Sequence, residues 1–154
     1  MGSNVEFPCF SLGHGAKKPD ELAKKPPMGT VPVLERNGEQ LFGSGAICRY
    51  VANATDSPLY PADKMQRARV DQWMDYFTCH LGHWFTKLYF ELAIKPKFNL
   101  GEPDEKDVAE ANKFATAQLD TLDSRLKNSE WLANDELSIP ELVPFALSEP
   151  QPCQ

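Results

Sequence analysis

The chain has 154 residues and a formal net charge of −6, and 42% of its residues are hydrophobic and 25% charged, which is typical of a globular protein. Acidic and basic residues are mixed along the chain without a basic stripe, so the composition argues against a nucleic-acid partner. Because no run of about eighteen apolar residues occurs, the sequence also predicts no membrane-spanning helix and no membrane partner.

The first part of the chain is expected to form short strands and turns. Val5–Leu12 predicts a strand, and Thr30–Glu35 predicts a second one. Asn37 and Gly38 form the strongest short hairpin signal, because both central residues of a type I′ turn need a positive φ. Gln40–Phe42 would then be the returning strand of a β-hairpin.

A helix is expected directly after this hairpin. Ser44 is predicted to cap a helix that begins at Gly45, because a serine side chain can accept a hydrogen bond from an unpaired N–H of the first turn. The segment from Asn53 to Asp63 is rich in turn residues and predicts a linker. The apolar face of the helix would consist of Ala46, Ile47, Tyr50, Val51 and Ala54.

Beyond the linker the hydrophobic spacing is helical throughout. Apolar residues three and four apart predict one long helix from about Lys64 to Lys95, ended by Pro96, with Trp73 and Phe77 in the core. The same spacing predicts a second helix from about Asp104 to Lys127. The residues from Ser138 to Glu141 form a capping box that would begin a third helix.

This order of elements, together with several short motifs, resembles the glutathione S-transferase family. The resemblance extends from about Val5 to Leu147 and implies an incomplete thioredoxin-like α/β domain, residues 1–57, followed by an all-α helical bundle, residues 64–154. We expect the chain to lack the first strand and helix of the family's N-terminal domain and the last helices of its C-terminal domain. The motifs are Thr30–Leu34 followed by Leu41–Tyr50, then Leu59–Pro61, Arg69–Trp73, Trp131–Ala133 and Leu137–Leu142.

The resemblance implies a glutathione site around the hairpin. A cis-proline at Pro32 would expose the backbone of Val31 to the cysteinyl part of glutathione, whereas a trans proline would be an ordinary bend. Ser44 would bind the γ-glutamyl carboxylate at a helix N-terminus. Gly43 stands where relatives usually place a Glu or Gln for the ligand's α-amino group. Lys17 is a candidate contact of the glycyl carboxylate, with a solvated surface lysine as the alternative.

The helical half would supply the pocket for the second substrate. By resemblance, Trp84, Phe85 and Tyr89 could line a pocket for an apolar electrophile, although an aromatic cluster at this spacing is also typical of a core. In the family a Ser, Tyr or Cys near the first strand stabilises the glutathione thiolate, and no residue of this sequence matches that role. His80 and His83 are too few ligands for a metal site, so no metal is expected.

Three functions remain open from the sequence. The chain could be an enzyme of detoxification that conjugates glutathione, its co-substrate, to small apolar electrophiles. It could instead be a non-catalytic glutathione-binding or interaction module, or an inactive fragment of a transferase. Turnover of an electrophile and retention on immobilised glutathione distinguish these functions.

Location and assembly follow from weaker signals. The four cysteines contain no CxxC pair, and the start of the chain lacks a secretory signal, which favours a reduced, cytoplasmic protein. A homodimer is expected as possible, because in relatives the long helix contributes to a two-fold interface. The charged residues Arg67, Arg69 and Asp71 of that helix are otherwise interpreted as a solvated face.

Overall fold

The computed structural model describes residues 32–148, and the first element in this range is a β-hairpin. Strand β1 (Val33–Arg36) pairs antiparallel with β2 (Glu39–Phe42). Asn37 and Gly38 both have positive φ, 53° and 81°, so the turn predicted from the Asn-Gly pair is confirmed. The strand predicted at Val5–Leu12 lies outside the described residues.

Helix α2 (Ser44–Ala54) follows β2 after a single residue. Its N-cap is Gly43, which has φ 87° and no side-chain cap, so the prediction that Ser44 caps a helix beginning at Gly45 is wrong by one residue. A φ of 87° is readily adopted only by glycine, and it lets the chain turn from strand to helix within one residue.

The predicted apolar face of α2 is also largely wrong. The side chains of Tyr50 and Val51 are 37% and 45% exposed, whereas Ala52, outside the predicted set, is 7% exposed. The buried side chain of α2 is the small one of Ala52, which packs with residues from elements far along the sequence, among them Met74 and Ile139.

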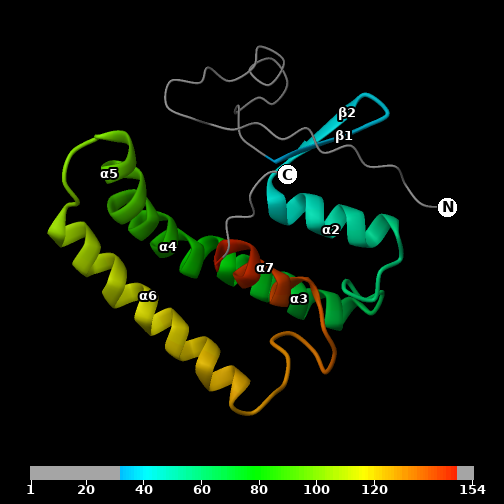
Figure 1. Ribbon diagram of the computed structural model, residues 1–154. Helices are drawn as coiled ribbons and strands as arrows, with labels where there is room; N and C mark the ends of the chain where they lie inside the picture. Colours follow the sequence, from blue (N-terminus) through cyan, green and yellow to red (C-terminus); the bar gives the residue numbers. More distant parts are fainter. Residues whose placement is uncertain (1–31, 149–154) are drawn as a thin grey trace.

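The long helix predicted after the linker is present but is not uniform. Its α-helical parts are joined by two π-helical turns, η1 and η2, into one helical stretch (Figure 1). The prediction that Pro96 ends this stretch is wrong, because the helix continues to Phe98 and ends at Asn99, which has φ 51°. Pro96 lies in the first turn of α5, directly after η2. The segments are α3 (Lys64–Tyr76), η1 (Phe77–Leu81), α4 (Gly82–Tyr89), η2 (Phe90–Ile94) and α5 (Lys95–Phe98).

Gly82 permits the first π-helical turn. A Cβ atom added to Gly82 would lie 2.4 Å from the carbonyl oxygen of Phe77, closer than packed atoms can approach. We therefore expect Gly82→Ala to lower the free energy of unfolding by about 1–3 kcal/mol in a urea titration, as overpacking usually does. Thr86→Ala, at an exposed position of α4, is the control and should change stability by less than about 0.5 kcal/mol. If Gly82→Ala is as stable as the wild-type chain, the close approach to the carbonyl oxygen of Phe77 does not require glycine at this position.

Helix α6 (Glu105–Leu126) runs back along α4, and the second predicted helix is confirmed (Figure 1). The side chain of Asp104 caps it by accepting hydrogen bonds from the N–H groups of Lys106 and Asp107. The loop before α6 is held by Glu91, a 3% exposed residue that binds Nζ of Lys95 at 2.5 Å and the N–H of Asp104 at 2.8 Å. These hydrogen bonds hold the pKa of the Glu91 carboxyl below its usual value.

Helix α7 (Ile139–Ser148) packs on α3 and begins at the predicted capping box. The carboxylate of Glu141 accepts a hydrogen bond from the N–H of Ser138 at 2.9 Å, as the motif predicts. The hydroxyl of Ser138 donates to the same carboxylate, and the N–H of Leu132 donates to its other oxygen at 2.8 Å. The carboxylate therefore joins the start of α7 to the segment that precedes it.

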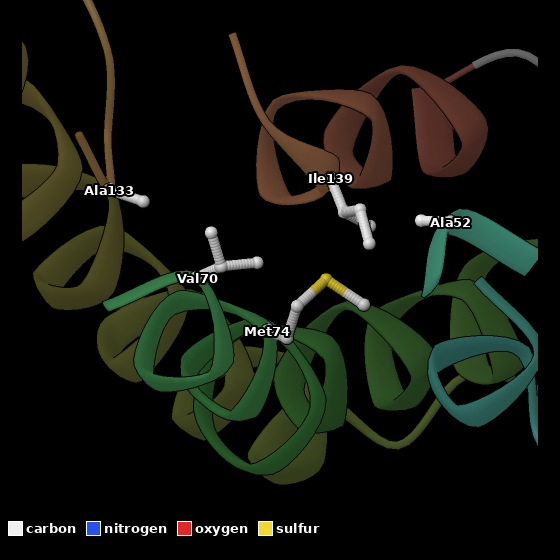
Figure 2. Close-up of a cluster of buried hydrophobic side chains, with 5 residues drawn as sticks. All are labelled: Ala52, Val70, Met74, Ala133 and Ile139. Atoms are coloured by element: carbon white, nitrogen blue, oxygen red, sulfur yellow. The ribbon is translucent and has the colours of Figure 1, made fainter. Parts of the chain in front are cut away.

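Two neighbouring clusters of buried side chains form the core. One joins α2 to the helical half through Ala52, Met74 and Ile139 (Figure 2). Ala133 and Val70 belong to the same cluster. The second cluster consists of Phe77, Leu81 and Leu132. Phe77 is 2% exposed and the partly buried Trp73 packs against both clusters, so both predicted core positions are confirmed.

Candidate functional site

The junction between the hairpin and α2 presents an open helix N-terminus. The first α-helical hydrogen bond runs from the N–H of Ile47 to the carbonyl of Gly43 at 3.0 Å. The N–H groups of Ser44, Gly45 and Ala46 precede it and have no intrahelical acceptor, and no side chain of the described residues caps them. Since Ser44 itself is exposed, a hydroxyl and the positive end of the helix dipole meet at a site that favours an anion.

The hairpin brings predicted site residues from two segments to the same end of the sheet. Val33 pairs with Phe42 in the strand register. Pro32 precedes Val33 and Gly43 follows Phe42, so these two residues lie at neighbouring strand ends. Pro32 is exposed there. Val31 and Lys17, the other predicted glutathione contacts, lie outside the described residues.

The aromatic residues predicted to line an apolar pocket point in different directions. The ring of Trp84 is stacked on Phe114 of α6, with 4.6 Å between the ring centroids and 16° between the planes. Phe85 and Tyr89 are four residues apart on α4, so they share a helix face, and they are 37% and 58% exposed. The structure therefore groups Phe85 with Tyr89 and places Trp84 in the contact between α4 and α6.

A charged cluster joins α2 to α3 and the linker, and the sequence did not indicate it. Nε of Arg49 lies 2.5 Å from Oδ1 of Asp71, and Nη2 lies 3.0 Å from Oδ1 of Asp75. The hydroxyl of Tyr60 donates to both oxygens of Asp71 at 3.1 Å. Burial and this hydrogen bond raise the pKa of Tyr60. Asp71 and Asp75 are four residues apart, which indicates one helix face, but nothing in the pattern indicates Arg49 as their partner.

The interpretation of this part of α3 as a solvated face is therefore wrong for two of its three residues. Arg67 donates from Nε to the carbonyl of Pro61 at 2.8 Å, and its guanidinium carbon lies 4.6 Å from the ring centroid of Tyr60. Asp71 is bound as described above, and only Arg69 is exposed. The linker and α2 cover part of this face, which periodicity alone does not reveal.

His80 and His83 are both exposed on the long helical stretch. The ring of His80 lies 5.7 Å from that of Tyr76, and the ring of His83 lies 4.7 Å from that of Trp84. Within residues 32–148, no group of three or more His, Cys, Asp or Glu side chains could hold a metal ion. No helix in the same range is long and apolar enough to cross a membrane.

Family models match both halves of the chain. Residues 1–53 match the glutathione S-transferase N-terminal domain, and residues 83–148 match the C-terminal domain. A probable glutathione S-transferase of Oryza sativa subsp. japonica is 32% identical over 143 residues, which cover 92% of this chain and 66% of that protein. Elongation factor 1-gamma 2 of the same plant is 30% identical over 139 residues, which cover 87% of this chain and 31% of that protein.

Solved structures give the same result. Glutathione transferase F2 of Populus trichocarpa matches with a TM-score of 0.74 and 31% identity, over 84% of this chain and 61% of that one. Glutathione S-transferase I of maize, in complex with an atrazine–glutathione conjugate, matches with a TM-score of 0.74 and 28% identity, over 85% of this chain and 61% of that one. This chain thus spans somewhat less than two thirds of these transferases. The hairpin with α2 corresponds to part of their thioredoxin-like domain and the remaining helices to their helical domain, and the chain belongs to the glutathione S-transferase family.

Proposed function

We propose that the chain binds glutathione at the junction of the hairpin and α2 and transfers it to small apolar electrophiles. The observation that carries this proposal is the exposed Ser44 at the open N-terminus of α2, beside the hairpin end at which Pro32 lies. Related solved structures contain lactoylglutathione and an atrazine–glutathione conjugate, which supports glutathione as the ligand class.

Each predicted contact has a distinct part in this proposal. Ser44 and the first N–H groups of α2 bind the γ-glutamyl carboxylate. The backbone of Val31, presented by Pro32, pairs with the cysteinyl unit as an added strand, and Lys17 contacts the glycyl carboxylate. Gly43 supplies no acid for the ligand's α-amino group, so one charge-assisted hydrogen bond is lost and the affinity should be lower than with Glu at that position.

The acceptor substrate would bind against α4. Phe85 and Tyr89 present an exposed aromatic face that an apolar electrophile could cover. Trp84, stacked on Phe114, would border this pocket while fixing α4 against α6. In this proposal residues 1–57 form the glutathione-binding domain and residues 64–154 the helical domain that binds the acceptor.

A second candidate function is a non-catalytic binding or interaction module. The match to elongation factor 1-gamma 2, a protein that is not named as a transferase, favours it. Two measurements separate the candidates: turnover of a generic electrophile, and retention on immobilised glutathione. Turnover with retention supports the enzyme, and retention without turnover supports the module. A chain that does neither would be an inactive fragment.

We also propose a cytoplasmic location and a homodimer. Cys48 and Cys79 are free and exposed thiols, which suits a reducing compartment. The dimer would use the long helical stretch, as the resemblance to the family implies. Sedimentation equilibrium of the full chain tests the dimer, because a single species at the monomer mass would contradict it.

The carboxylate assignment predicts the effect of Ser44→Ala. Removing the hydroxyl takes one hydrogen bond from a charged group, so glutathione should bind more weakly by about tenfold or more in isothermal titration calorimetry. Ser124→Ala, at an exposed position of α6, is the control and should leave the affinity unchanged. An affinity for Ser44→Ala equal to that of the wild-type chain would remove Ser44 from the site.

A further inference from the structure

We propose that Arg49 is a positioning residue of the glutathione site: by binding Asp71 and Asp75, it holds the first turn of α2 in place against α3. This inference rests on the proposed function, because it concerns the same helix N-terminus. Arg49 is separated from Ser44 by one helical turn and makes no proposed contact with the ligand. Its effect would therefore act through the orientation of α2.

The side chain of Arg49 lies back over the beginning of α2. Its Nη1 atom is 3.3 Å from the position that a Cβ on Gly45 would take, and Cε of Met74 is 3.6 Å from the same position. The absence of a side chain at Gly45 thus lets the guanidinium and α3 approach the first turn closely. Gly45 directly follows Ser44, so this contact is adjacent to the proposed carboxylate site.

Three elements meet at the guanidinium of Arg49. Asp71 and Asp75 come from successive turns of α3, and Tyr60 comes from the linker and binds Asp71. The guanidinium presents donors in a fixed planar fork, so two acceptors on different turns fix its orientation as well as its distance. The side chain of Arg49 is 25% exposed and that of Asp71 is 37% exposed, so the pair is shielded in part from water.

The position of the first turn of α2 depends on the Arg49 cluster because of where else the helix is attached. Near its C-terminal end the helix is attached through Ala52, which packs with Met74 and Ile139 (Figure 2). Val51 is exposed, and the hydroxyl of Tyr50 accepts a hydrogen bond from Arg36 of β1, so Tyr50 holds α2 to the hairpin and not to the helical half. Ala52 and the Arg49 cluster are therefore two points at which α2 is attached to the helical half. Without the cluster the helix could pivot about Ala52, and its first turn, farthest from that pivot, would move most.

Movement of the first turn should weaken anion binding, because the hydrogen bonds from its N–H groups depend on distance and angle. We expect Arg49→Gln to bind glutathione about fivefold more weakly than the wild-type chain, and Asp71→Asn to behave similarly. Arg49→Lys keeps the charge but cannot bridge both carboxylates with the same fork, so its affinity should lie between those of Arg49→Gln and the wild-type chain.

The experiment pairs affinity with local amide exchange. Glutathione binding is measured by calorimetry at low temperature on variants whose folding circular dichroism has first confirmed, and hydrogen exchange is followed separately for residues 44–54 and for α6. The control is Asp123→Asn, which removes the exposed ion pair with Lys127, 2.6 Å long and remote in sequence from α2. The proposal expects weaker binding and about tenfold faster exchange in α2, with exchange in α6 unchanged.

The outcomes separate this inference from the proposed function. Unchanged exchange in α2 of Arg49→Gln would overturn the positioning role whatever the affinity. Faster exchange in α2 with an unchanged affinity would overturn it too, because the cluster would then only stabilise the fold. If the wild-type chain does not bind glutathione, the proposed function fails, and the exchange result alone then decides whether Arg49 holds α2.

Discussion

Phe77→Ala is expected to lower the free energy of unfolding by about 3–5 kcal/mol, the usual cost of truncating a buried phenylalanine. Phe77 is 2% exposed and packs with Leu81 and Leu132 in the second core cluster. Its ring also meets that of Tyr76 edge-on, with centroids 6.0 Å apart. Since domains of this size are stable by about 5–15 kcal/mol, the variant should lose a large share of its stability.

Urea unfolding of the full chain measures this effect. Phe85→Ala is the matched control, because Phe85 lies on the same helical stretch but is 37% exposed, and it should cost less than about 1 kcal/mol. Phe77→Leu, which keeps most of the buried volume, should cost less than about 1.5 kcal/mol and stays measurable if the alanine variant unfolds. Equal losses at Phe77 and Phe85 would contradict the placement of the core.

Local signals in the sequence were enough to predict most of the secondary structure. The Asn37-Gly38 turn, the helix that begins near Asp104 and the glutamate of the capping box at Glu141 depend on interactions within a few residues of each other. The spacing of apolar residues predicts Phe77 in the core, because one helix face repeats every three to four residues. Such features need no knowledge of which distant element packs against them.

The π-helical turns, and contacts with a partner far along the chain, could not be predicted from the sequence. Apolar residues three and four apart predict a helix but do not reveal the π-helical turns η1 and η2, and a proline inside a helical pattern predicts an end at Pro96. The partner of Asp71 is Arg49, 22 residues earlier in the chain. Charged residues at helical spacing are usually solvated, and only the packing of α2 on α3 makes this pair partly buried.

In the candidate site, too, local signals predicted some features, and contacts with distant elements decided others. The Ser44 position at a helix N-terminus followed from the strand, glycine and serine in sequence, with an error of one residue in the cap. The hairpin register then places Pro32 beside Gly43, which was not predicted from the sequence. The direction of Trp84 did not follow, because its contact with Phe114 depends on how α6 lies against α4.

Glu141→Gln is the second large expected effect. The carboxylate of Glu141 accepts hydrogen bonds from the N–H groups of Leu132 and Ser138 and from the Ser138 hydroxyl. An amide replaces one acceptor oxygen by a donor, so one N–H group loses its partner. Leu132 and Ser138 are 4% and 1% exposed, so water cannot readily replace that partner. We expect a loss of about 1–3 kcal/mol in the free energy of unfolding, the cost of a buried unpaired group.

The control for this prediction is Glu136→Gln, because Glu136 is exposed in the same segment and its replacement should change stability by less than about 0.5 kcal/mol. Both variants remove one negative charge, so a difference between them in urea unfolding reports the lost hydrogen bond and not the change in net charge. The Glu141 carboxylate joins Leu132 of the second core cluster to Ser138, which precedes Ile139 of the first. The loss should therefore appear as one cooperative transition at lower urea, whereas separate unfolding of α7 would show that Glu141 holds only the helix start.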